Sequence, residues 1–308
     1  MLKKIHIARH HGFCMGVKRA IQIAEETAQR AAGPVTILNE IVHNDAVVAK
    51  FRAQGVGQAF AVDDVDGGTL IISAHGVAPA VKEAARNRGL NLVDATCPLV
   101  ERIYIILDKI VKNGYHVIHW GERDHDETRG VVGHAPGHIT VVSSREELLA
   151  LPEWADRRLG LTVQTTAHMD DVAAVEELAR EKWPHIEVFN TICNATTQRQ
   201  NAVMDLAPQV DMVLVVGSAS SANSNRLARI ANAICGRGIL IASAADIRDE
   251  WFAEETDIAQ VGVTAGASTP DFLVEEVIRR LVEISGGTAE VIKPERRRRR
   301  GSDEAALD

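Results

Sequence analysis

The chain has 308 residues, of which 46% are hydrophobic and 25% are charged, and its formal net charge is −8. This balance is typical of a globular protein and excludes a chain that is disordered throughout. Its apolar runs are all shorter than the roughly 18 residues of a membrane helix, and the polar start MLKKIHIARHHGFC does not resemble a signal peptide. We therefore expect a cytoplasmic protein without a membrane partner.

The negative net charge argues against a nucleic-acid partner, because phosphate backbones are bound by clustered Lys and Arg side chains. One basic run, Arg296 to Arg300, lies between Lys293-Pro294 and the polar end GSDEAALD. We interpret residues 294–308 as a disordered tail rather than as a nucleic-acid contact.

Apolar, β-branched runs alternate along the whole chain with amphipathic segments of helix length. This alternation is the pattern of βαβ units, so the predicted fold class is α/β with parallel sheets covered by helices. Length alone allows two larger domains or three small ones that share a centre. The candidate strands include Lys4 to Ala8, Val35 to Leu38, Thr69 to Ser73, Leu90 to Asp94, His116 to Trp120, Gly160 to Gln164, Met212 to Val216 and Ala259 to Val263.

Polar or glycine-rich loops follow most of these strands. In parallel sheets, ligands bind beyond the carboxyl ends of the strands, so these loops form the expected functional surface. The loops contain neither a GxGxxG fingerprint nor a Walker lysine, so the sequence favours neither a dinucleotide nor a P-loop nucleotide. In chain order the loops are NEIVHN, SAHGV, HWGERDHDE, QTTAHMDD, GSASSANSNR and TAGASTPD.

Three of the four cysteines share one local setting. Disulfides are not expected in a cytoplasmic chain of this length, because that compartment is reducing. Cys14, Cys97 and Cys193 each follow a strand-like run and directly precede a helix pattern. A helix start offers unpaired N–H groups and partial positive charge, which favour a thiolate ligand. Pro98 suits a first helical turn, and Gly16 allows close backbone approach near Cys14.

The spacing of these cysteines predicts that they act together. They are 83 residues (14 to 97) and 96 residues (97 to 193) apart, each about one small α/β unit, which implies a pseudo-threefold arrangement. Three thiolates do not complete a structural zinc site, whereas a [4Fe–4S] cluster held by three cysteines keeps one iron open for substrate. The alternative for each cysteine is a small buried hydrophobe, and we prefer it only for Cys235, which ends a helix pattern before a glycine.

With these cysteines in place, nine motifs in order resemble those of the 4-hydroxy-3-methylbut-2-enyl diphosphate reductases, the LytB or IspH family. The resemblance covers roughly residues 4–285. It implies a trefoil of three α/β domains around a central iron–sulfur cluster, with domain 1 at 14–97, domain 2 at 98–193, and domain 3 at 194–285 together with 1–13. The motifs are GFCMGVKRA, NEIVHN, SAHGV, DATCPLV, HDE, QTT, ICNATTQRQ, VGSASSANSNRL and GVTAGAS.

The resemblance implies reductive dehydroxylation of an allylic diphosphate, with two electrons, to isopentenyl and dimethylallyl diphosphate, the last step of the methylerythritol phosphate pathway. Reduced ferredoxin or flavodoxin is the implied electron donor, and Cys14, Cys97 and Cys193 match the cluster ligands. Loss of the open iron would give a [3Fe–4S] form. Two alternatives stay open: a cluster-dependent dehydratase that needs no external reductant, and an iron–sulfur sensor or electron carrier.

Further family positions fall in the strand-end loops. A diphosphate needs many hydrogen-bond donors, which hydroxyls, imidazoles and the N–H groups of helix starts provide. Where the family often has a second serine, this chain has Ala222, which leaves only a backbone N–H at that position. The residues that match substrate-binding positions are His43, His75, His125, Thr165, Thr166, Ser221, Asn223 and Ser268.

Glu127 matches the proton donor of the family, and Thr165 matches a threonine that can pass protons between Glu127 and the substrate. Burial beside a diphosphate would disfavour the ionised carboxylate, so Glu127 would hold a proton near neutrality. We therefore expect these two residues to be catalytic. The neighbouring carboxylates of the charged run GERDHDETRG, namely Glu122, Asp124 and Asp126, are interpreted as solvated surface.

Overall fold

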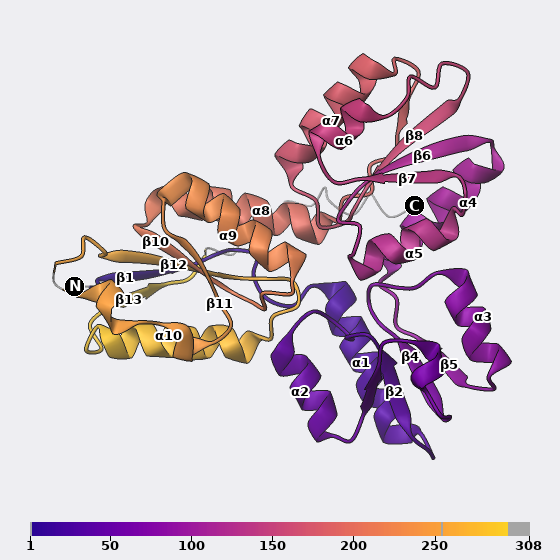
Figure 1. Cartoon of the computed structure of the whole chain (residues 1–308). Coiled ribbons are helices and arrows are strands. Elements are labelled where there is room, and N and C mark those ends of the chain that lie inside the picture. The colour runs from indigo at the N-terminus through magenta and orange to yellow at the C-terminus, as the bar shows by residue number, and fades with distance from the viewer. Residues whose placement is uncertain (1, 254, 295–308) are drawn as a thin grey trace, which may run out of the picture.

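The computed structural model describes residues 2–253 and 255–294, so the basic run Arg296 to Arg300 and almost all of the predicted tail lie outside the described residues. The described chain forms three parallel sheets, each covered by helices, which surround a common centre (Figure 1). The predicted α/β class is therefore confirmed. None of the helices within the described ranges is long and apolar enough to cross a membrane.

The three sheets repeat one strand order. In the first two sheets, the first and third strands along the chain lie side by side, the second lies outside the first, and the fourth lies outside the third. In the third sheet, the three strands between residues 212 and 265 follow the same order, and the first strand of the chain lies outside the last of them. The first sheet has the order β3 (Gly57–Ala59), β2 (Val35–Leu38), β4 (Thr69–Ile72), β5 (Asn91–Asp94). The second has the order β7 (Ile139–Val142), β6 (Tyr115–Trp120), β8 (Arg158–Val163), β9 (Glu187–Val188). The third has the order β11 (Gly238–Ile241), β10 (Met212–Val216), β12 (Gln260–Ala265), β1 (Lys4–Ile7), β13 (Glu290–Ile292).

Helices connect these parallel strands, as crossover connections require. The α-helices are α1 (Met15–Arg30), α2 (Asp45–Ala53), α3 (Pro79–Asn87), α4 (Pro98–Lys112), α5 (Asp126–His134), α6 (Arg145–Ala150), α7 (Met169–Lys182), α8 (Asn194–Leu206), α9 (Ala222–Cys235) and α10 (Asp271–Ile284). Short 3₁₀ helices lie at Val62–Asp64, Ala207–Gln209, Ala244–Asp246 and Asp249–Phe252.

The apolar pattern of each element explains where it packs. All of β10 is buried, and its unbroken apolar run MVLVV is the pattern of a parallel strand covered on both faces. In contrast, α4 buries Ile103, Leu107 and Ile110, which follow one another at intervals of four and three and so lie on one face of the helix. That face joins the apolar core of the second sheet.

The chain passes from one sheet to the next at each of the three predicted ligand cysteines. β1 belongs to the third sheet, but α1, which follows Cys14, packs on the core of the first sheet. β5 belongs to the first sheet, and α4, after Cys97, packs on the second. β9 belongs to the second sheet, and α8, after Cys193, packs on the third. Each cysteine therefore lies at a junction between two units.

This exchange supports the division that we propose into units 14–97, 98–193 and 194–285 with 1–13. The third sheet extends beyond residue 285, because β13 pairs with β1 in parallel register from Lys4 opposite Glu290. This short strand is not among those predicted from the sequence.

Polar contacts join the units around the centre. The hydroxyl of Ser218, in the third unit, donates to a carboxylate oxygen of Asp45 in the first unit at 2.9 Å. The guanidinium of Arg226, in the third unit, contacts the carboxylates of Glu122 and Asp171 in the second unit, each at 3.4 Å. These contacts fix the relative positions of the loops that carry the predicted site.

Candidate active site

One cavity of about 100 Å³ lies where the three sheets meet. It opens at the ends of the paired strands β2 and β4, β6 and β8, and β10 and β12. From each pair, the chain continues toward opposite edges of the sheet, and ligands bind at such switch points in parallel sheets. The cavity brings together every predicted site residue: Cys14, Cys97, Cys193, His43, His75, His125, Glu127, Thr165, Thr166, Ser221, Asn223 and Ser268, with Ala222 beside them.

Each of the three cysteines is the N-cap residue of a helix. Cys14 precedes α1, Cys97 precedes α4 and Cys193 precedes α8, as the sequence predicts. The sulfur of Cys14 accepts a hydrogen bond from the backbone N–H of Val17 at 3.4 Å. Pro98 occupies the first turn of α4. The unpaired N–H groups of three helix starts thus surround the sulfur atoms, which favours negative charge at this point.

A backbone hydrogen bond ties each cysteine to the loop that follows β12, β4 or β8. The cysteine N–H donates, and the acceptor is the carbonyl directly before a predicted substrate ligand: Ser268, His75 or Thr166. The same backbone contact therefore fixes a proposed cofactor ligand next to a proposed substrate ligand in all three units. The pairs are Cys14 with Ala267 (3.1 Å), Cys97 with Ala74 (2.9 Å) and Cys193 with Thr165 (3.0 Å).

The side chains around the sulfur atoms fit a metal–sulfur group. A Cβ atom at Gly16 would lie 2.4 Å from the sulfur of Cys97 and 4.0 Å from that of Cys14, so glycine is required for two sulfurs to approach the first turn of α1. Burial raises the pKa of the Cys97 thiol, and the nearby Cys14 and Cys193 raise it further. A bound metal reverses this effect, because it binds the deprotonated thiolate.

Three histidines form a compact cluster on one side of the cavity. The rings of His43 and His75 are stacked with their centroids 4.0 Å apart, and the ring of His125 meets them edge-on at 5.2 and 5.7 Å. The Nδ1 of His43 lies 2.9 Å from a carboxylate oxygen of Glu40. The hydroxyl of Tyr104, from the second unit, donates to the backbone carbonyl of His75 at 3.2 Å and helps to position that loop.

Two of these imidazoles are held in the neutral form. Burial lowers the pKa of His125 to about 4, with further contributions from His43 and Arg129. Burial, followed by the charges of His43 and His125, lowers the pKa of His75 well below its ordinary value. The Nδ1 of His125 accepts from the backbone N–H of Glu127 at 3.2 Å, so its Nε2 carries the proton and can donate to an anion.

Glu127 is buried at the start of α5, with 2% of its surface exposed. One carboxylate oxygen accepts from the backbone N–H of Thr165 at 2.7 Å, and the other accepts from the Thr165 hydroxyl at 2.5 Å. Burial raises the pKa of Glu127, while these two hydrogen bonds partly oppose the shift. The pair can therefore hold a proton and move it through the threonine hydroxyl.

The third unit contributes unpaired hydrogen-bonding groups. Both amide atoms of Asn223 are buried without a protein partner, which indicates that they await a ligand. Ser221 is the N-cap of α9, and its hydroxyl oxygen accepts from the N–H of Ser224 at 3.3 Å. Ala222 is the first residue of α9, so its N–H belongs to the unpaired set at the helix start. The hydroxyl of Ser268 donates to the carbonyl of His43 at 2.9 Å.

The comparisons with known proteins agree with this geometry. The profile of the family described as LytB protein matches residues 5–282 of this chain. The chain belongs to the LytB protein family. A relative from Tolumonas auensis, named 4-hydroxy-3-methylbut-2-enyl diphosphate reductase, is 40% identical over 293 residues, which are 93% of this chain and 94% of the relative. A relative of the same name from Symbiobacterium thermophilum is 41% identical over 88% of this chain and 94% of its own length.

Two solved structures resemble the LytB-family fold described above. The E-1-hydroxy-2-methyl-but-2-enyl-4-diphosphate reductase of Plasmodium falciparum aligns with a TM-score of 0.90 at 29% identity, over 97% of this chain and 94% of that chain. A second structure, (E)-4-hydroxy-3-methyl-but-2-enyl diphosphate reductase, described as the terminal enzyme of the non-mevalonate pathway, aligns with a TM-score of 0.67 at 36% identity, over 92% and 100% of the two chains. The predicted trefoil of three α/β units is confirmed.

Sequence reasoning missed two charged residues of this LytB-family site. The interpretation of Asp126 as solvated surface is wrong, because its side chain is only 14% exposed and a carboxylate oxygen lies within 4.8 Å of ring nitrogens of His43 and His75. Arg199 is buried in α8 and donates to the carbonyl of Gly12 at 2.5 Å. Asp126 stands in a run of exposed charges and Arg199 in a polar helix, so neither carried a signal of burial.

Proposed function

We propose that this chain is a 4-hydroxy-3-methylbut-2-enyl diphosphate reductase. In the reaction, the allylic C–O bond breaks and a C–H bond forms, while two electrons and two protons enter. The products are water and either isopentenyl or dimethylallyl diphosphate. The observation that carries the proposal is one cavity in which three helix-capping cysteines face three histidines and a buried carboxylate. The relatives with about 40% identity carry the name of this activity.

We further propose that Cys14, Cys97 and Cys193 hold a [4Fe–4S] cluster. When bound, such a cluster supplies the electrons and one iron position without a thiolate ligand, and loss of that iron gives a [3Fe–4S] form. Reduced ferredoxin or flavodoxin is the proposed electron donor, and the cytoplasm the proposed compartment. This assignment is supported by the close approach of the Cys97 sulfur to Gly16 and by the position of each cysteine at a helix start.

The diphosphate would bind across all three units. Neutral imidazoles donate through their N–H groups, and an approaching anion favours uptake of a further proton. Because each unit contributes donors from two neighbouring loops, the diphosphate can be held at several oxygens at once. The proposed ligands are His43, His75, His125, Thr165, Thr166, Ser221, Asn223 and Ser268, with the N–H of Ala222.

Glu127 and Thr165 would supply protons. Burial raises the pKa of Glu127, which favours the protonated form of its carboxyl group. The Thr165 hydroxyl, 2.5 Å from that carboxylate, can give its proton to the departing oxygen and receive one from Glu127 in the same movement. The hydroxyl of the substrate then leaves as water, which avoids the release of hydroxide into a buried site.

The test is an anaerobic assay of the purified protein with its iron and sulfide content measured. With a loaded cluster and reduced methyl viologen, the protein should convert the allylic diphosphate to the two five-carbon products. Turnover without any reductant would instead indicate a dehydratase. A fully loaded protein that binds the diphosphate but forms no product would contradict the proposed activity.

A further inference from the structure

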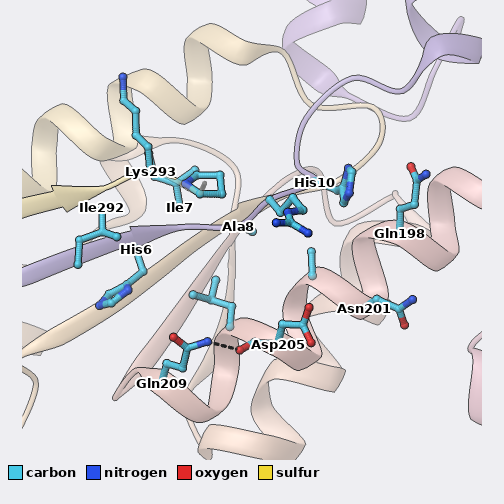
Figure 2. A pocket seen from close by; sticks show the side chains of 14 residues that line it. His6, Ile7, Ala8, His10, Gln198, Asn201, Asp205, Gln209, Ile292 and Lys293 are labelled. Atoms are coloured by element: carbon cyan, nitrogen blue, oxygen red, sulfur yellow. Dashed lines mark hydrogen bonds between the residues drawn. The ribbon is translucent and has the colours of Figure 1, made fainter. Parts of the chain in front are cut away.

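A second cavity, of about 470 Å³, lies along the third unit, and we call it the α8 groove (Figure 2). Its walls are α8, the segment from β1 to His10, and the end of the described chain at Lys293 and Pro294. Figure 2 shows His10 and Gln198 at one end of the α8 groove, with His6 and Lys293 toward the other. None of the predicted catalytic residues lines it.

Both walls of the α8 groove lead directly to ligand cysteines. Gln198, Asn201 and Asp205 line it and are exposed on α8, spaced by three and four residues, so they form one helix face. Asn194 extends that face by four residues and directly follows Cys193. The opposite wall continues along the chain from β1 through His10 toward Cys14.

One buried arginine lies close to both the α8 groove and the sulfur atoms. Arg199 follows Gln198 on α8, is 5% exposed, and donates to the carbonyl of Gly12 at 2.5 Å. Burial lowers the pKa of Arg199, while the nearby thiols of Cys14 and Cys193 raise it. Burial, followed by the charge of the same Arg199, lowers the pKa of His10 in the groove. Arg199 therefore lies close to both the groove and two of the proposed cluster ligands.

The α8 groove is positively charged on a chain that is negative as a whole. Arg9 and Lys293 line it, and Asp205 is the carboxylate among its lining residues. The formal charge of the whole chain is −8, so an acidic partner is repelled by most of the surface and attracted here.

We propose that the α8 groove is the docking site of an acidic one-electron carrier protein of the iron–sulfur or flavin type. The inference rests on the proposed function, because it assigns the entry point of the two electrons. Electron tunnelling weakens steeply with distance, so a carrier must dock where the cover over the cysteines is thin. A carrier that delivers one electron must also dock twice in each turnover, which favours a small, salt-sensitive interface over a tight one.

The experiment compares two reductants on the loaded holoenzyme at low ionic strength. The variant is the double charge change Gln198→Glu with Lys293→Glu, and the control is Arg86→Glu on α3, an exposed charge change in the first unit. With an acidic plant-type ferredoxin, kcat/KM should fall about tenfold in the double variant, and added salt should narrow the difference. With reduced methyl viologen, which needs no protein interface, all three proteins should turn over at equal rates.

Equal ferredoxin kinetics in the double variant and the control would overturn the proposal. A matching loss with viologen would also overturn it, because the groove would then act through the central cavity. The proposed reductase activity is tested separately, by measuring turnover of the unchanged protein with reduced methyl viologen. If that turnover is absent, calorimetric binding of ferredoxin to the same variants still decides whether the groove docks an acidic carrier.

Discussion

The substitution Gly16→Ala tests the convergence of the cysteines with a single methyl group. The added Cβ would lie 2.4 Å from the sulfur of Cys97, and ordinary contact begins at 3.4 Å, so the sulfur or the helix must move by 1.0 Å (3.4 less 2.4). Metal–ligand distances tolerate deviations of only about 0.2 Å. The displaced sulfur can therefore no longer share a metal centre with its partners in the native geometry.

The size of the expected effect follows from these distances. Small displacements of ligand-orienting groups reduce metal affinity about 10–100-fold, so we expect Gly16→Ala to lose most of its iron and sulfide during anaerobic purification. The cluster-free fold should survive, because the three atoms nearest to the added Cβ are side-chain atoms of Cys97 and Cys14, which can move when they hold no metal. The assay combines iron and sulfide analysis, visible absorbance, and thermal unfolding of the cluster-free protein.

The matched control is Gly33→Ala, which adds the same methyl group elsewhere. No atom lies within 4 Å of a Cβ at Gly33, and its backbone does not have a positive φ. This variant should retain the cluster content of the unchanged protein. If Gly16→Ala also retained full iron and an unchanged spectrum, the close approach of Cys97 to α1 would be refuted, and with it the shared centre.

Three further predictions concern the cavity. Glu127→Gln should lower kcat about 10²–10⁴-fold at unchanged iron content, whereas turnover equal to that of the unchanged protein would remove Glu127 as proton donor. Asp126→Asn removes a negative charge beside the histidines and should tighten binding of inorganic diphosphate about fivefold in calorimetry, since one charge at 4 Å costs about 1 kcal/mol even in water. Burial raises the pKa of Asp126, so its carboxylate is neutralised as the pH falls. The difference in diphosphate affinity between Asp126→Asn and the unchanged protein should therefore shrink toward acidic pH, and a difference that does not change with pH would contradict this. Cys193→Ala should abolish iron binding, while Cys235→Ala, at the end of α9, should leave iron content unchanged, and equal loss in both would contradict the assignment.

The sequence predicted the central strands well and the sheet edges poorly. All eight candidate strands are present within two residues at each end, because their apolar runs are long enough to stand out. The strands that were not included, among the described residues, are β3, β7, β9, β11 and β13, and each lies at the edge of its sheet. An edge strand is short and buried on fewer sides, so its apolar pattern is weak.

Some residues of the candidate site could likewise be predicted from local sequence, and others could not. The cysteines could be predicted because strand, cysteine and helix recur in three places, a repeat that local pattern reveals. The placement of Glu127 in the interior depends instead on the hydrogen bonds from Thr165, 38 residues further along the chain. Asp126 lies beside His43 and His75 of another unit, and Arg199 is bonded to Gly12, which is 187 residues away in the sequence. For these residues the family resemblance, or the structure, supplies what local sequence does not contain.

The first strand of the chain completes the last sheet, and this closes the molecule into a ring. β1 takes the position beside β12 that β5 and β9 take beside β4 and β8. The third sheet is therefore completed only when the start of the chain reaches residues near position 260, since Lys4 lies opposite Gln260. The last sheet to be made along the chain thus depends on contacts between residues more than 250 positions apart.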